Sequence, residues 1–280
     1  MTISFLIKTL RRTKHVTSRI MRTLRTPHCS YSTAEGLTLY APKSWKELTQ
    51  EQLRYVFFLL STFPEKTVVK TYMFLRFTGL EVEKSIAGGV RCRLMGDKRG
   101  RKINIATWQI QSLLHQFDYI DTYDGMGVRL ESIQGYHAVD ALLHGLPFAD
   151  YLNCEAIYQT FLQTKDETRI DALARILYRD NEDNAPERLV LTPTERTGTF
   201  IWYTSAKMAM AKAFPHFFKP SEGETTPQLM EMMNAQIRAL TEGDVTKEEK
   251  VEELDCWRCL TELDAKAREA AEFERKYGNK

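Results

Sequence analysis

The residue pair best suited to chemistry is Cys256 and Cys259, which are separated by Trp257 and Arg258. Two thiols at this spacing exchange electrons when they stand at a helix start, where the helix dipole lowers the pKa of the first thiol. Here the flanking pattern predicts one long helix with the pair in its middle, and no second cysteine pair lies near enough to complete a local zinc site. We therefore interpret both cysteines as small apolar packing residues.

Other patterns that carry catalysis are missing from the sequence. The six histidines form no HExxH pair, residues 87–90 lack the frame of a phosphate-binding loop, and Gly125 and Gly127 lack a third glycine. No GxSxG turn is present, and no serine or single cysteine pairs with a base in sequence. We therefore expect a protein that is not an enzyme and has no catalytic residue, cofactor or metal.

A cationic cluster lies between residues 90 and 105. Its members are Arg91, Arg93, Lys98, Arg99, Arg101 and Lys102. Such side chains contact phosphates or an acidic partner, so the cluster is a candidate anion-binding or nucleic-acid-binding surface. The alternative is an ordinary solvated ribbon whose charges prevent the addition of another strand.

Large apolar residues are dense between residues 200 and 218, and three methionines follow at positions 230, 232 and 233. They exceed what one core-facing stripe requires, and methionine-rich surfaces adapt readily to partners. The candidate partner surface comprises Trp202, Met208, Phe217 and Phe218. Core packing is the alternative explanation for most of them.

The charge of the chain is divided unevenly. The net charge is +2, but seven of the 39 basic residues precede the first acidic residue, Glu35, so the rest carries 32 basic and 37 acidic residues. Residues 1–35 are thus a basic leader, which fits a disordered tail, an organellar transit peptide, a peripheral membrane anchor or a nucleic-acid-binding arm. No apolar run is long enough to span a bilayer, and five scattered cysteines argue against a disulfide framework. We expect a cytoplasmic protein, or an organellar one if the leader is a transit peptide.

Helix start signals divide the first part of the body. Ser44 and Glu47 fit a capping box, which predicts a helix to about residue 61, and a second helix is expected from Pro64 to Gly79. Alternation of apolar and charged residues predicts a basic β-hairpin over 90–105. A helix over 106–119 and a third strand over 128–133 follow.

From residue 136 almost to the end the expected pattern is helical, apart from loops at 180–188 and 215–226. Three capping pairs predict helix starts, namely Thr164 with Glu167, Thr192 with Glu195, and Thr246 with Glu249. The last of these helices is expected to continue to about Tyr277. Since strands and helices do not alternate, a Rossmann or barrel enzyme is disfavoured.

The predicted fold class is mainly α, with about nine helices and one small antiparallel β-hairpin inserted among them. The predicted organisation is a leader at 1–35, a helical hairpin with the basic β-hairpin at 36–135, and a helical domain at 136–280. The last two regions form either two domains or a single body.

Two C-terminal stretches, Ile237–Lys247 and Cys256–Glu269, together with Trp45–Thr49, resemble uncharacterised helical proteins encoded in prophage-type elements of gut bacteria. This resemblance implies a role in phage morphogenesis, for example as a tail-assembly chaperone or adaptor, and brings no catalytic residues with it. The sequence therefore predicts a non-enzymatic interaction protein with protein partners or an oligomeric state. The alternative is a nucleic-acid-binding accessory protein that uses the leader and the 90–105 hairpin.

Overall fold

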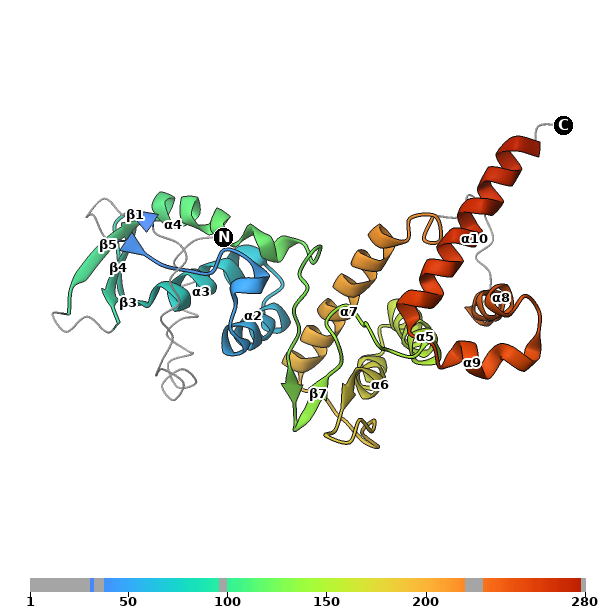
Figure 1. The fold of residues 1–280 in the computed structure, drawn as a ribbon. Helices are drawn as coiled ribbons and strands as arrows, with labels where there is room; N and C mark the ends of the chain where they lie inside the picture. Colours follow the sequence, from blue (N-terminus) through green and yellow to red (C-terminus); the bar gives the residue numbers. More distant parts are fainter. Residues whose placement is uncertain (1–30, 33–37, 96–99, 220–228, 278–280) are drawn as a thin grey trace. The chain divides into compact units, whose positions relative to one another are not determined.

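The computed structural model describes residues 31–32, 38–95, 100–219 and 229–277. The chain divides into two compact units, Met1–Thr122 and Tyr123–Lys280. The described residues form nine α-helices, α2 to α10, and three small antiparallel sheets, so the protein is mainly α-helical (Figure 1). None of the described helices combines the length and apolarity needed to cross a membrane. Of the predicted leader, only β1 (Tyr31–Ser32), which pairs with β2 (Thr38–Leu39), lies within the described residues.

The first unit contains the two expected N-terminal helices, α2 (Gln50–Thr62) and α3 (Lys66–Thr78). The predicted capping box at Ser44 is wrong, because the Ser44 side chain caps nothing and only a short 3-10 turn, η1 (Trp45–Glu47), follows it. The capping box that starts α2 is formed instead by Thr49 and Gln52. The Gln52 amide donates to the Thr49 hydroxyl at 3.3 Å, and the Thr49 amide donates to the Gln52 side-chain oxygen at 3.0 Å. This second box lies close behind the first and determines where the helix begins.

The predicted β-hairpin is part of a three-stranded antiparallel sheet in the order β3-β4-β5, formed by β3 (Leu80–Ile86), β4 (Gly89–Leu94) and β5 (Lys102–Ala106). The expectation of a single hairpin was therefore wrong, since β3 adds a strand to it. Gly89 allows β5 to approach closely, because a Cβ at this position would collide with the carbonyl oxygen of Ile105. The apolar side of the sheet supplies Val90, Cys92, Ile103 and Ile105 to the core.

The helix expected over 106–119 is α4 (Thr107–Leu114), which continues as a 3-10 helix, η2 (His115–Asp121). Buried Phe117 and Ile120 pack η2 into the core of the first unit. An ion-pair cluster adds to this packing, because the amino group of Lys70 on α3 donates to the carboxylates of Asp118 and Asp121, the latter at 2.5 Å.

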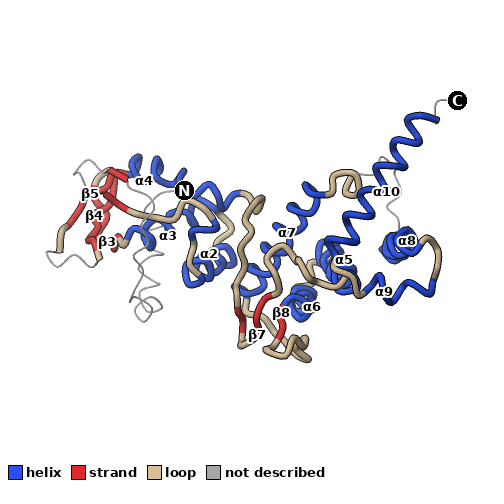
Figure 2. Tube along the Cα trace, viewed as in Figure 1, coloured by secondary structure: helices blue, strands red, loops and turns tan. Residues whose placement is uncertain are grey.

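The second unit begins with a small sheet that the sequence did not predict. β6 (Ser132–Ile133) pairs with β7 (Tyr136–Ala138), which pairs with β8 (Tyr178–Arg179), as Figure 2 shows in red for β7 and β8. The strand expected over 128–133 is therefore confined to its last two residues, and Tyr136–Ala138, which was expected to belong to a helical region, forms a strand. The hydroxyl of Tyr178 donates to the carbonyl oxygen of Leu130 at 3.2 Å. Such contacts join residues 123–135 to the second unit, whereas the sequence placed the division after residue 135.

Three helices follow, namely α5 (Phe148–Thr164), α6 (Thr168–Leu177) and α7 (Pro193–Ala213). The capping box of Thr192 and Glu195 is confirmed, with the Thr192 amide donating to the Glu195 carboxylate at 2.9 Å. The box predicted at Thr164 is wrong, because Thr164 is the last residue of α5. The Asp166 carboxylate instead accepts the amide of Thr168, the first residue of α6, at 3.0 Å.

The C-terminal part consists of α8 (Leu229–Thr241), the short 3-10 turn η3 (Val245–Lys247), α9 (Glu248–Glu252) and α10 (Cys256–Tyr277). The sequence predicted one helix from Thr246 to Tyr277, but the chain breaks between α9 and α10. Asp244, and not Thr246, caps the first turn by accepting the Thr246 amide at 3.1 Å.

Candidate interaction surface

The break before α10 is made by contacts with a distant segment of the same unit. The Cys256 amide donates to the carbonyl oxygen of Leu146 at 2.9 Å, and the Phe148 amide donates to that of Leu254 at 2.8 Å. The Asp255 carboxylate accepts the amide of Arg258 at 3.1 Å, as an N-cap does. Backbone groups between α9 and α10 are therefore engaged with the loop before α5 and cannot continue a helix.

The two cysteines consequently lie at the start of α10, and their predicted position in the middle of a helix was wrong. A helix start favours a thiolate, but both side chains are buried, at 0% and 2% exposure. Burial raises the pKa of Cys256 to about 12 and that of Cys259 to about 11. Both thiols are thus protonated at neutral pH, as expected for packing residues.

Trp257 anchors the first turn of α10. Its indole nitrogen donates to the carbonyl oxygen of Leu142 at 2.7 Å. Its ring lies 4.4 Å from the ring of His144 and 5.2 Å from that of Phe214, measured between centroids. The start of α10 is therefore firmly held by the body of the second unit.

Exposed apolar side chains gather in the helices on either side of this anchor. Of the eleven large apolar residues that are exposed among those described, six lie between residues 229 and 277. They are Met230, Met232, Val245, Leu254, Phe273 and Tyr277. Single exposed apolar residues are ordinary, so these six point to a binding surface only where they border a pocket or one another.

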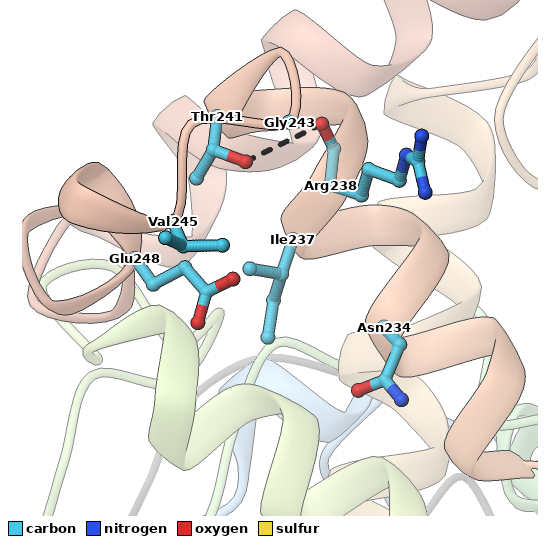
Figure 3. Close-up of a pocket in the computed structure, with 7 residues that line it drawn as sticks. All are labelled: Asn234, Ile237, Arg238, Thr241, Gly243, Val245 and Glu248. Carbon is cyan, nitrogen blue, oxygen red and sulfur yellow. Dashed lines mark hydrogen bonds between the residues drawn. The ribbon is translucent and has the colours of Figure 1, made fainter.

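A pocket of about 330 Å³ lies between α8 and the segment formed by η3 and α9 (Figure 3). It is lined by Asn234, Ile237, Arg238, Thr241, Gly243, Val245 and Glu248. Figure 3 shows the Glu248 carboxylate and the Val245 side chain turned toward Ile237, while Arg238 extends away from them. We call these seven residues together with Met230 the α8–α9 surface, because Met230 lies two turns before Ile237 on the same face of the helix.

The α8–α9 surface is set in an acidic segment. Residues 229–255 contain eight acidic and three basic side chains, which gives a net charge of −5. Two of the acids pair with lysines, Asp244 with Lys247 at 3.4 Å and Glu242 with Lys266 at 3.6 Å. A pocket of mixed polar and apolar lining in an acidic segment is complementary to a partner that presents basic and apolar groups.

The cationic cluster lies on the solvent-facing side of the β3-β4-β5 sheet. Arg93 pairs with Glu81 at 2.6 Å and Lys102 with Glu83 at 3.1 Å, while Arg91 donates to the Asn104 side chain at 3.0 Å. Arg101 is exposed immediately before β5, and Lys98 and Arg99 lie outside the described residues. The two glutamates of β3, a strand that the sequence prediction missed, therefore neutralise part of this cluster.

The predicted partner surface is only partly at the surface. Trp202 is 1% exposed and donates to the carbonyl oxygen of Ala141 at 2.8 Å, so it is a core residue and its assignment to a surface was wrong. Met208, Phe217 and Phe218 are half-buried, and the Phe217 amide donates to Asp264 at 2.9 Å. Six of the exposed large apolar side chains lie further along the chain, between residues 230 and 277.

The exposed end of α10 carries a signal that the sequence prediction missed. Phe273 and Tyr277 stand four residues apart, and their rings are 4.8 Å apart between centroids. Apolar residues recur every three or four positions from Leu260 to Tyr277. The sequence could therefore have shown an apolar stripe that continues beyond the buried start of α10.

Among the residues that the structure describes, no three histidine, cysteine or acidic side chains gather as metal ligands would. Comparisons of the chain with protein-family models, with curated proteins and with solved structures find no match.

Proposed function

We propose that the protein is a non-enzymatic helical interaction protein that binds a protein partner through the α8–α9 surface. The observation that carries this proposal is the pocket between α8 and the η3–α9 segment, which Ile237 and the 72% exposed Val245 help to line, while exposed Met230 and Met232 lie on the same helix α8. Apolar side chains at the centre of a polar rim are the usual anatomy of a protein-binding patch. The resemblance of Ile237–Lys247 to prophage-encoded proteins supports a role in phage assembly, as an accessory protein or chaperone. The unpaired thiols of the described cysteines support a cytoplasmic location.

The test is capture of the partner by the tagged full-length chain in cells that express it, with cross-linking to locate the contact. Met230→Glu with Val245→Glu places two charges on the α8–α9 surface at positions that are 63% and 72% exposed, so the fold is retained. The matched control is Val190→Glu, at an exposed loop position of the same unit. Loss of a captured protein with the double variant and its retention with the control supports the proposal. Equal capture by all three chains contradicts it.

The alternative function is nucleic-acid binding through the sheet of the first unit. Lys84, Arg91, Arg93 and Lys102 share its solvent-facing side with two glutamates, which leaves an excess of cations. This function predicts retention on DNA that weakens steeply with salt, because phosphate contacts release counterions. It also predicts loss of retention when Arg91, Arg93, Arg99 and Arg101 are replaced by alanine. Absence of salt-dependent retention removes this alternative.

A further inference from the structure

The last element of the first unit, η2, is a 3-10 helix of seven residues that continues α4 to the boundary between the two units. 3-10 helices longer than about four residues are uncommon, because their hydrogen bonds have poor geometry. Phe117 and Ile120 are each 0% exposed and hold the body of η2 in the core. Asp121 and Thr122 are exposed, so burial of their side chains does not hold the end of this helix.

Two side chains from distant segments hold the end of η2 by its carbonyl groups. The indole nitrogen of Trp45 in η1 donates to the carbonyl oxygens of Tyr119 at 2.8 Å and Thr122 at 3.2 Å. The amino group of Lys66 in α3 donates to the two carbonyl oxygens between them, at 3.4 and 2.9 Å. The last carbonyl groups of a helix have no partner within it. Here all four accept a side-chain hydrogen bond, and we call Trp45 and Lys66 the η2 clasp.

A second lysine of α3 pairs with the carboxylates of η2. The amino group of Lys70, one turn after Lys66, contacts the carboxylates of Asp118 and Asp121. The side chain of Lys70 is 11% exposed, whereas that of Lys66 is 40% exposed. Lys70 therefore holds η2 from its buried side, while Lys66 lies at the solvent, where water can replace it on the carbonyl groups.

The second unit holds the chain directly after the clasp. Met126 is buried, and its amide donates to the carbonyl oxygen of Tyr123 at 3.3 Å. Asp124 pairs with Lys212 on α7 of the same unit at 2.5 Å. Because the clasp holds the carbonyl group of Thr122, the carbonyl groups held by the first and the second unit belong to consecutive residues.

We propose that the η2 clasp is a releasable contact that sets the length of the connection between the two units. When the clasp opens, buried Ile120 becomes the last residue held by the first unit. Residues 121 and 122 then join the connection and add about 7 Å of extended chain. Local opening of this kind does not require the unit to unfold, because the core residues of η2 stay buried. Residues at the end of an element are a usual place for a hinge. The clasp goes beyond the proposed function, because it uses no residue of the α8–α9 surface.

The first experiment measures amide hydrogen exchange in the full-length chain by mass spectrometry. Lys66→Met removes the hydrogen bonds of Lys66 and keeps its apolar stem. We expect exchange at residues 119–124 to become about tenfold faster, as loss of a hydrogen bond from a charged group implies. Exchange in α2 and in the β3-β4-β5 sheet should not change. The matched control is Lys46→Met, at an exposed lysine of η1, which should leave residues 119–124 unchanged.

The second experiment measures the length of the connection. Spin labels are placed at exposed positions of the two units by Gln111→Cys and Gln163→Cys in a Cys29→Ser background, since the other four cysteines are buried. Lys66→Met should broaden the distribution of distances between the labels, and Lys46→Met should not. Unchanged exchange at residues 119–124, faster exchange throughout the first unit, or an unchanged distance distribution each overturns the proposal.

Discussion

The indole nitrogen of Trp257 donates a hydrogen bond to the carbonyl oxygen of Leu142 at 2.7 Å, which ties the first turn of α10 to the loop before α5. The neighbouring Cys256 amide extends the same contact to Leu146. Together these bonds determine where the last helix begins and how its exposed end is supported.

Replacement of Trp257 by phenylalanine removes this hydrogen bond but keeps a ring against His144 and Phe214. We expect Trp257→Phe to lower the free energy of unfolding by about 1 kcal/mol, the usual contribution of one hydrogen bond. Urea unfolding followed by circular dichroism measures this change. The matched control is Trp108→Phe at an exposed tryptophan, which should change stability by no more than about 0.5 kcal/mol. Equal effects of the two substitutions would show that the anchor is unimportant.

Glu155 on α5 joins two polar groups of α7. It accepts a hydrogen bond from the Tyr203 hydroxyl at 2.6 Å and pairs with the amino group of Lys207, and the side chains of Glu155 and Lys207 are 15% and 19% exposed. Tyr203→Phe removes one hydrogen bond and should cost about 1 kcal/mol. Glu155→Gln leaves a largely buried lysine without its counter-charge and should cost more, about 3 kcal/mol. Thermal unfolding of both variants decides the order, and a larger loss for Tyr203→Phe contradicts the role given to the ion pair.

The acid sensitivity of the first unit should depend on Asp118. The hydrogen bond from Lys70, and next that from His115, hold the pKa of Asp118 below its usual value. Because the folded pKa is the lower one, the stabilisation is complete above the unfolded value near 3.9 and is lost as pH falls through the folded pKa. We expect Asp118→Asn to be less stable than the parent near neutral pH and to lose less stability on acidification. Parallel stability curves for the two chains would contradict this.

The four described cysteines should react slowly with thiol reagents while the protein is folded. Cys92 and Cys154 are buried like the C-terminal pair, and burial raises the pKa of Cys92 to about 12 and that of Cys154 well above its usual value. In a Cys29→Ser background, we expect almost no thiol to react at neutral pH and all four to react in denaturant, because only the thiolate attacks. Rapid labelling of Cys256 in the folded protein would contradict its interpretation as a packing residue and would favour a redox role for Cys256 and Cys259.

The elements that the sequence predicted correctly are those decided by neighbouring residues. Thr192 and Glu195 cap α7 as expected, since a capping box needs only residues three positions apart. The strand β3 could have been recognised, because Leu80 to Glu83 alternates apolar and acidic residues as β4 does with basic ones. This omission also hid the pairing of Arg93 with Glu81.

Elements that depend on distant partners could not be predicted in the same way. β7 exists because it pairs with β8, and the end of α9 is enforced by backbone bonds to Leu146 and Phe148, neither of which leaves a local pattern. For the same reason Trp202 was assigned to a surface, since its burial depends on the carbonyl group of Ala141 and on surrounding helices. The exposed end of α10 is the opposite case, because its spacing is visible in the sequence, whereas the sequence does not show that no described element covers it.

The break between α9 and α10 has a consequence for how the protein can be divided. Cys256 can begin a helix only when the loop at residues 142–148 is present to occupy the backbone groups of Leu254 and Cys256. A fragment that starts at α8 would lack this loop, and its sequence pattern would then favour one continuous helix from residue 246 onward. The C-terminal helices are therefore not an independently folding fragment. Their surfaces have their native form only on a chain that retains the rest of the second unit.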